Sequence, residues 1–351
     1  MPKKLRPSAR RPIRKARNPK PLSGAVAVVA GATRGAGRGI ARALGEAGAT
    51  VYCTGRSVRG TPSPYNRPET IEETAELITS AGGTAVAVRV DHTVEKDVQA
   101  LFQRVEKEHG RLDVLVNSVA GEDPMMAQWA SFWTTDLNNG DAILRQALLS
   151  HVITAKHAAP LMMKKHRGLI VEVTENDLLL AGGNVLTQIV KFSQKALATI
   201  WAAELRKHGV AAIAITPGFL RSESMLDHFG VTEENWRDAG KKDKNFLESE
   251  SPLFVGRAVA ALAQDPKVLD RSGQLLSSWE LGRHYRFTDF DGRRPDWGAL
   301  DVDYSQLPSS LLAEIMDAVQ VQTEWLKVLS KRTERYRGTL LKKVKRRGST
   351  V

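Results

Sequence analysis

The residues near the start of the chain that are best suited to chemistry form a glycine-rich turn. Glycines stand at positions 31, 35 and 37 of the segment AGATRGAGRG. Glycine permits a tight turn and lets a pyrophosphate approach main-chain N–H groups at the positive end of a following helix. A glycine-rich turn alone is weak evidence, but this one lies between an apolar β-branched run and an amphipathic segment. It therefore predicts a site for the pyrophosphate of a nucleotide.

Two arginines indicate which nucleotide is bound. Arg34 lies inside the glycine turn, and Arg56 follows Gly55 at the end of the second apolar run. A carboxylate at this second place would hold the ribose 2′-hydroxyl of NAD, whereas a cation suits the 2′-phosphate of NADP. Arg56 therefore favours NADP, and the family resemblance given below implies that Arg34 is a second cation on the 2′-phosphate, where paired guanidinium groups add geometry to charge. The plain alternative is a pair of surface arginines, but we predict NADP.

The elements that must position these residues alternate along the chain. Short β-branched runs predict strands, and the longer segments between them have helical spacing of apolar residues. Near-continuous apolar strands separated by helices predict a parallel sheet covered on both faces, an α/β doubly wound fold. The predicted strands cover residues 25–31, 50–55, 84–90, 112–118, 168–174 and 210–216, with a possible last strand at 275–282 and a terminal helix at 309–329.

The charge of the chain is concentrated at its two ends. The chain has 351 residues and a net charge of +12, yet residues 1–20 hold nine cations and no acid, and residues 331–351 hold nine cations and one acid. These ends together carry +17, so the body between them carries −5. Five prolines between positions 2 and 21 also argue against an N-terminal helix. We expect a disordered basic tail at 1–22, a nucleotide-binding domain at 23–290 and a C-terminal extension with a helix and basic tail at 291–351.

Composition excludes several classes of protein. A single cysteine, Cys53, excludes a disulfide framework or a cysteine metal cluster, and suits a reducing compartment. No run approaches the roughly 18 apolar residues of a membrane span. None of the eight histidines has a recognisable metal spacing; His151 and His157 fit helix faces better than ligand roles. We expect a cytoplasmic protein without a metal site.

With these motifs the chain resembles the short-chain dehydrogenase/reductase family over about residues 24 to 285. The family's Gly-xxx-Gly-x-Gly turn is present, although Ala30 stands where a threonine usually precedes it. The resemblance implies a Rossmann fold, a nicotinamide cofactor and homo-oligomers. It carries the cofactor-binding role to Gly31, Thr33, Arg34, Gly35, Gly37, Arg56, Asp91, Asn117, Lys191, Pro217, Gly218 and Ser222.

The resemblance also implies a catalytic set of Asn, Ser, Tyr and Lys. In that set the tyrosine exchanges a proton with the substrate oxygen, the lysine lowers the tyrosine pKa, and the serine orients the carbonyl. The family spacing of 26 residues from the lysine to the Pro-Gly pair selects Lys191 over Lys195, since Pro217 follows Lys191 by 26 positions. In this register Thr187 takes the tyrosine position, Thr174 the serine position and Ala147 the asparagine position.

Three functions fit this departure from the family pattern. The first is an NADPH-dependent carbonyl reductase, with Lys191, Thr174 and Thr187 at the catalytic positions. Its acid would be a water relay, Lys191, or one of Tyr285, Tyr65 and Glu175. The second is a cofactor-binding or scaffolding protein that has lost redox turnover. The third is a nucleic-acid or polyanion binder acting through the basic tails, which is poorly supported because Tyr336 is the one aromatic residue among their charges.

Two loops should form the substrate wall, since ligands of such folds lie at the C-terminal ends of the strands. Residues 121–140 and 221–236 are rich in large apolar side chains, which predicts a hydrophobic small-molecule substrate, although part of the set must be ordinary loop packing. The candidates are Met125, Met126, Trp129, Phe132, Trp133, Met225, Leu226, Phe229 and Trp236. Candidate interface or core positions in a homo-oligomer are Ala158, Met162, Phe192 and Trp201.

Overall fold

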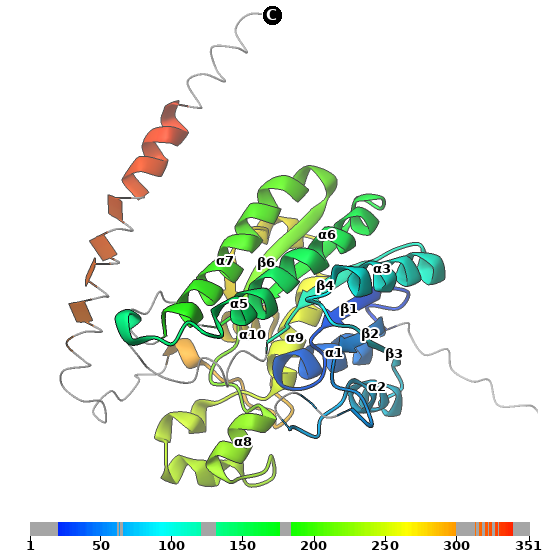
Figure 1. The fold of residues 1–351 in the computed structure, drawn as a ribbon, viewed down its shortest axis with the longest axis horizontal. Helices are drawn as coiled ribbons and strands as arrows, with labels where there is room; N and C mark the ends of the chain where they lie inside the picture. Colours follow the sequence, from blue (N-terminus) through cyan, green and yellow to red (C-terminus); the bar gives the residue numbers. More distant parts are fainter. Residues whose placement is uncertain are drawn as a thin grey trace, which may run out of the picture.

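A seven-stranded parallel sheet forms the centre of the computed structural model, in the order β3-β2-β1-β4-β5-β6-β7 (Figure 1). The structure describes residues 20–61, 63, 66–120, 131–175 and 184–299, with parts of a helix between Ala313 and Thr339. The strands are β1 Val26–Ala30, β2 Thr50–Gly55, β3 Thr84–Arg89, β4 Val114–Asn117, β5 Gly168–Val173, β6 Val210–Thr216 and β7 Leu275–Ser277. The predicted doubly wound sheet is therefore confirmed.

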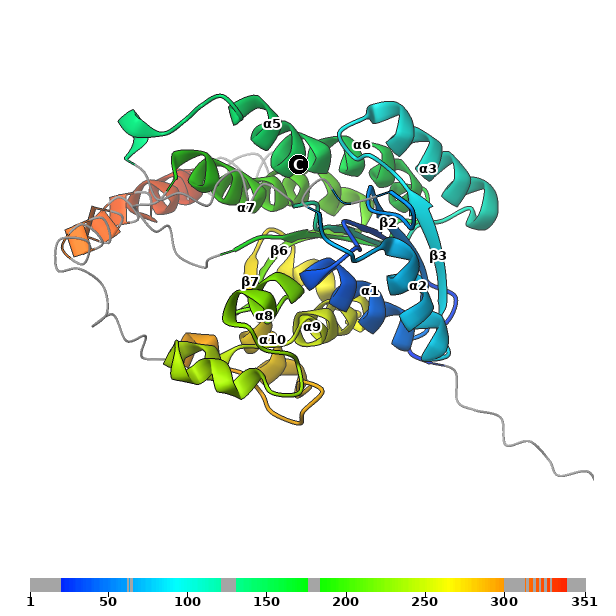
Figure 2. The same cartoon turned by 60° about the horizontal axis from the view of Figure 1, so that its bottom comes forward.

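Helices cover both faces of this sheet (Figure 2). One face carries α1 Gly35–Glu46, α2 Ile71–Ser80, α9 Pro252–Gln264 and α10 Ser278–Tyr285. The other face carries α3 Glu95–His109, α5 Gly140–Leu144, α6 Ser150–Met163 and α7 Val185–Leu205. Strands β1 and β6 are buried along their whole length, which explains why they are apolar without alternation.

The close packing of α1 on α9 depends on two glycines. A Cβ atom on Gly39 would lie 1.9 Å from the main-chain oxygen of Pro252, and one on Gly256 would lie 2.3 Å from the oxygen of Gly39. Both positions therefore require glycine. The contact fixes the axis of α1, whose N-terminus carries the glycine turn.

The last strand is shorter than predicted. Residues 275–277 pair with β6, but Ser277 then caps α10 together with Glu280 in a capping box. A serine followed three residues later by glutamate is a helix-start signal. That signal stops the strand after three residues, where the apolar pattern alone suggested a strand to residue 282.

Two further parts of the chain lie beyond the sheet. Helix α8 Glu223–Phe229 and the 3-10 turns Trp236–Lys241 and Lys244–Glu248 form a small lobe beside the sheet (Figure 1). In the C-terminal helix, the described apolar side chains Met316 and Val321 are 67% and 69% exposed, so these two do not pack on the body. In the part of the chain that the structure describes, every helix is too short or too polar to cross a lipid bilayer. Residues 1–19, within the predicted basic tail, lie outside the described residues.

Candidate active site

The glycine turn lies at the crevice between β1 and β4, where the strand order reverses direction. Gly31 has φ +83°, and a Cβ atom there would lie 2.3 Å from the Ser118 main-chain oxygen. A Cβ atom on Gly37 would lie 2.0 Å from the oxygen of Gly31. Ligands of open α/β sheets bind at this kind of crevice. The backbone therefore forms a close cradle that side chains at these two positions would fill.

A carboxylate already faces the start of α1. The Gly35 N–H donates to Glu223 Oε2 at 2.7 Å, and Arg38 lies 3.5 Å from the other carboxylate oxygen. The first N–H groups of a helix favour an anion. Glu223 thus occupies a place suited to a pyrophosphate, and it brings α8 against the glycine turn. Sequence reasoning missed it, although it directly follows the predicted cofactor residue Ser222.

The predicted phosphate-binding arginines have partners that the sequence did not reveal. Arg34 donates to the buried Glu69 at 3.1 Å, and Arg67 binds the same carboxylate with two nitrogens. Burial raises the pKa of Glu69, but hydrogen bonds from Arg67 and Arg34 outweigh it and hold the pKa low. Glu69 therefore stays ionised and shared between two cations. Thr33 packs against Gly55, where a Cβ atom would lie 2.9 Å from its Oγ1.

Arg56 lies at the end of β2, near the loop after β3. It donates to Gln146 at 2.9 Å. Burial raises the pKa of Asp91, but hydrogen bonds from Thr93 and the charge of Arg56 lower it overall. An ionised Asp91 and a cationic Arg56 are thus neighbours at the end of the crevice where the sequence predicts adenosine binding.

At the other end of the crevice, Thr174 and Lys191 lie together. The Thr174 hydroxyl, 1% exposed as a residue, donates to the main-chain oxygen of Lys191 at 3.3 Å. Lys191 Nζ lies 3.5 Å from Glu175 Oε1, and the Glu175 side chain is 61% exposed. Thr187 is half-buried in the first turn of α7, four residues before Lys191 and on the same helix face. Asn184, and not Thr187, caps α7 by accepting from Leu186 N.

Ala147, the predicted counterpart of the family asparagine, lies where the helix departs from α-helical geometry. Ala147 is fully buried inside a π-helical turn, Arg145–Leu149, between α5 and α6. Gln194 of α7 donates to the Ala147 oxygen at 3.0 Å. Single π turns within helices often mark functional sites. The main-chain oxygen of Ala147 is therefore tied to α7, one turn after Lys191.

Beneath Thr174, three buried polar residues link β4, β5 and α6. Asn117 donates to Glu172 Oε1 at 2.6 Å, and His151 Nδ1 lies 2.7 Å from Glu172 Oε2. The other ring nitrogen of His151 faces the Val119 oxygen at 3.0 Å and must donate to it. Asn117, predicted to bind cofactor, uses its side-chain amide to join the sheet to α6.

The structure separates one candidate acid from this site. Tyr285 lies at the end of α10, on the sheet face opposite α7, and its hydroxyl donates to Asp265. Burial, with this bond, raises the pKa of Tyr285 to about 12. A second candidate, Tyr65, lies outside the described residues. Glu175 is the candidate that the structure brings to Lys191.

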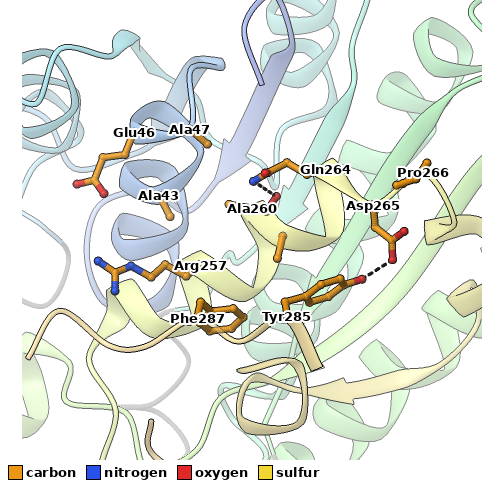
Figure 3. Close-up of a pocket in the computed structure, with 11 residues that line it drawn as sticks. Ala43, Glu46, Ala47, Arg257, Ala260, Gln264, Asp265, Pro266, Tyr285 and Phe287 are labelled. Atoms are coloured by element: carbon orange, nitrogen blue, oxygen red, sulfur yellow. Dashed lines mark hydrogen bonds between the residues drawn. The ribbon is translucent and has the colours of Figure 1, made fainter. Parts of the chain in front are cut away.

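Tyr285 instead lines a cavity of about 490 Å³ between α1, α9 and α10 (Figure 3). The cavity adjoins Ala43 and Ala47 at the C-terminal end of α1, away from the glycine turn at its N-terminal end. Apart from Tyr285, a candidate acid that lies away from Lys191, its lining includes none of the predicted cofactor or catalytic residues. This cavity is therefore separate from the candidate active site.

The predicted substrate loops divide into packed and exposed parts. Phe229 and Trp236 are buried with Phe246 in the core of the small lobe, so they are the part that is ordinary packing. Phe132 and Trp133 are 70% and 74% exposed. Met125, Met126 and Trp129 lie outside the described residues. Of the interface candidates, Ala158 and Met162 belong to the core, Trp201 packs partly on it, and Phe192 is exposed.

Comparison with known proteins agrees with the fold and the glycine turn. Residues 25–229 match the family model described as short chain dehydrogenase. The dehydrogenase/reductase SDR family member 1 of Mus musculus is 38% identical over 295 residues, covering 82% of this chain and 91% of the relative. The human protein of that name is 37% identical and covers 78% and 85%. A hydroxysteroid dehydrogenase from Escherichia coli has the same fold, with a TM-score of 0.59 at 22% identity, covering 74% and 98%. By matched length, by identity and by the cradle at Gly31 and Gly37, the chain belongs to the short-chain dehydrogenase/reductase family of oxidoreductases.

Proposed function

We propose that this oxidoreductase uses NADP(H) and transfers hydride between the nicotinamide and a carbonyl or alcohol group of a hydrophobic small molecule. The observation that carries the proposal is the pair of guanidinium groups, Arg34 and Arg56, at the predicted adenosine end of the glycine cradle. Strand β2 ends at Gly55, and Arg56 follows it in place of the carboxylate that would favour NAD. Membership of the family supports the nicotinamide cofactor; the arginines support its 2′-phosphate.

The electrostatics of the adenosine end support this choice. Glu69 accepts a hydrogen bond from Arg34, and Arg67 already binds both of its carboxylate oxygens. A 2′-phosphate carries more negative charge than one carboxylate and can accept from several donors. It can therefore share Arg34 with Glu69 while Arg56 binds it from the other side.

At the chemical end, the chain's own residues can orient a substrate and hold a proton. The bound cofactor would supply hydride. We assign Thr174 to donate a hydrogen bond to the substrate oxygen, since its hydroxyl can rotate away from the Lys191 carbonyl. Lys191, with Glu175 3.5 Å away, would hold the proton that the substrate oxygen takes up, directly or through water. Thr187 lies one turn from Lys191, where its hydroxyl can support that water.

The missing phenol supports a second candidate function, a cofactor-binding protein with little or no turnover. A threonine hydroxyl is far less acidic than a phenol and reaches several ångströms less far, so Thr187 cannot replace a tyrosine as the proton donor. One experiment separates the two functions: NADPH binding by fluorescence, and NADPH consumption with aldehydes, ketones and quinones. Reduction of a panel member supports the enzyme, and saturable binding without consumption supports the second function. Failure to bind NADPH contradicts both.

We also propose that the chain forms homo-oligomers through α7. Three large apolar side chains on this helix, Ile189, Phe192 and Ile200, are 44%, 46% and 51% exposed. Exposed apolar side chains gathered on one helix favour burial against a partner. Sedimentation analysis of the wild type and of Phe192→Asp tests the assembly; a monomeric wild type would contradict it.

A further inference from the structure

The segment after α10, which we call the strap (residues 286–299), returns to the loop that follows β6. It lies outside the family-model match, which ends at residue 229. The strap begins at Arg286, whose φ is +60°, and ends in the 3-10 turn Trp297–Ala299. In Figure 2 its orange ribbon lies beside the yellow-green small lobe. Its buried contacts are with loops near the predicted cofactor site.

The first of these contacts is made by Asp289. This residue is 1% exposed, and its carboxylate accepts hydrogen bonds from the Ser251 main-chain N–H, at 2.9 Å, and from the Ser251 hydroxyl. It also lies 3.5 Å from the guanidinium of Arg221, which is 1% exposed and follows β6. A buried charge needs such partners. Asp289 therefore ties the strap to both the start of α9 and the loop after β6.

A stacked group of cations strengthens the same connection. Arg221 binds Glu233 at 2.8 Å and lies over the Trp236 ring at 4.2 Å from the centroid. Arg293 of the strap lies over the same ring at 4.6 Å and donates to the Ser249 oxygen at 3.1 Å. Cation–π contacts and charge-assisted hydrogen bonds of this kind hold a loop in one conformation.

At its end the strap reaches the Pro217–Gly218 turn itself. The Trp297 ring packs edge to face on Phe219 with centroids 5.6 Å apart. A Cβ atom on Gly218 would lie 2.9 Å from Trp297 Cβ and 3.2 Å from Glu250 Oε2. Trp297 of the strap and Glu250 thus leave no room for a side chain at position 218, which explains the glycine there.

Glu250 holds the turn by main chain and side chain. Its N–H donates to the Phe219 oxygen at 2.9 Å, and its oxygen accepts from Arg221 N at 2.8 Å. Its Oε2 accepts from Gly218 N at 2.9 Å and from the Ser278 hydroxyl at 2.5 Å. Among the described residues Oε1 has no hydrogen-bond partner, and burial raises the pKa of Glu250 to about 8. Keeping a carboxyl group there is costly, so a role for it is expected.

We propose that the strap and Glu250 position the Pro217–Gly218 turn against the nicotinamide half of the bound cofactor. The turn lies at the same edge of the sheet as the glycine cradle: a Cβ atom on Gly35 would lie 3.7 Å from Ser222 Cβ. The adenosine half, by contrast, would be held by Arg34 and Arg56. This inference rests on the proposed function, and it makes Trp297, Asp289 and Glu250 positioning residues.

The test compares two ligands of the full chain by calorimetry. NADP⁺ contains both halves of the cofactor, whereas 2′,5′-ADP contains the adenosine half alone. Trp297→Ala should weaken NADP⁺ binding about 10-fold, the effect of losing roughly one good contact, and change 2′,5′-ADP binding less than about 2-fold. Phe290→Ala, at a strap residue that is 49% exposed, is the matched control and should change neither.

A second pair of variants tests the hydrogen bond of Glu250. Glu250→Ala removes the acceptor of Gly218 N and should weaken NADP⁺ about 10-fold. Glu250→Gln keeps an acceptor oxygen and should restore NADP⁺ affinity to within about 3-fold of the wild type. Equal losses for both ligands, or no loss of NADP⁺ affinity in either Trp297→Ala or Glu250→Ala, would overturn the positioning role. A wild type that binds neither ligand would overturn the proposed function, and with it the positioning role that rests on it.

Discussion

The two ends of the crevice differ in how they relate to the family. At the nucleotide end, Gly31 and Gly37 satisfy a requirement of the backbone, because a Cβ atom would come within 2.3 and 2.0 Å of main-chain oxygens. At the chemical end, the register drawn from the family resemblance would leave Lys191 alone with the family residue type and put Thr174 and Thr187 at the serine and tyrosine positions. The scaffold for the cofactor would then persist while the chemistry beside it changes.

The largest expected effect is at the nucleotide end. Gly37→Ala places a Cβ atom 2.0 Å from the oxygen of Gly31, so the turn must open. We expect NADPH binding to weaken on the order of 100-fold or more in a fluorescence titration. Gly140→Ala is the control, because a Cβ there meets Leu186 at an ordinary 3.8 Å. Equal affinities of the two variants would show that the cradle is not the cofactor site.

At the chemical end, the sharpest change is Thr187→Tyr. A phenol four residues before Lys191 restores the proton donor that the family uses, and general acids contribute about 100-fold or more. We expect a gain of about that size in kcat for NADPH-dependent reduction. Thr187→Phe adds the ring without the hydroxyl and should give no gain. Equal rates in both variants would show that position 187 does not correspond to the family's catalytic tyrosine.

The choice of cofactor depends on the cations at the adenosine end. Arg56→Glu replaces a phosphate donor by an acid and should shift the NADPH-to-NADH preference about 30-fold toward NADH, measured as kcat/KM or as Kd. Arg59→Glu is the nearby control, since Arg59 is exposed and pairs with Glu76. An unchanged NADPH affinity in both Arg56→Glu and Arg34→Glu would refute the assignment of the 2′-phosphate site.

A smaller effect concerns stability and pH. Burial raises the pKa of Glu250 from 4.5 to about 8 in the folded chain, so the folded state keeps a proton that the unfolded state releases. The stability of the wild type relative to Glu250→Gln should therefore fall as pH rises from 4.5 to about 8, and then stay constant. Thermal unfolding should show Glu250→Gln at least about 2 °C more stable at pH 9 than the wild type. If the stability difference between the wild type and Glu250→Gln were the same at pH 5 and at pH 9, the raised pKa of Glu250 would be contradicted.

The smallest effect concerns the acid at the start of α1. Glu223 accepts from Gly35 N at 2.7 Å and must yield to a pyrophosphate there. Glu223→Gln removes the competing charge and should tighten NADPH binding about 3-fold at low salt, with a smaller gain at high salt. Weaker binding in this variant would show that Glu223 supports the cofactor site.

The sequence predicted the elements better than the partners of the site residues. Strand β2, for example, covers residues 50–55 as predicted, because apolar runs between helices leave little choice of register. The partners Glu69 and Glu223 lie 35 and 188 residues from Arg34 and Gly35, so no local pattern reveals them. Glu172 stood inside an apolar strand, and its pairing with His151 depends on how α6 packs. The strap's contacts are equally non-local, since Trp297 reaches Phe219 across the fold.

We propose above all that a working NADPH site adjoins a chemical end without a phenol. Parallel fluorescence titrations of the full chain with NADPH and NADH test it most directly. We expect saturable NADPH binding at least about 10-fold tighter than NADH binding. Equal affinities, or no binding of either nucleotide, would contradict it.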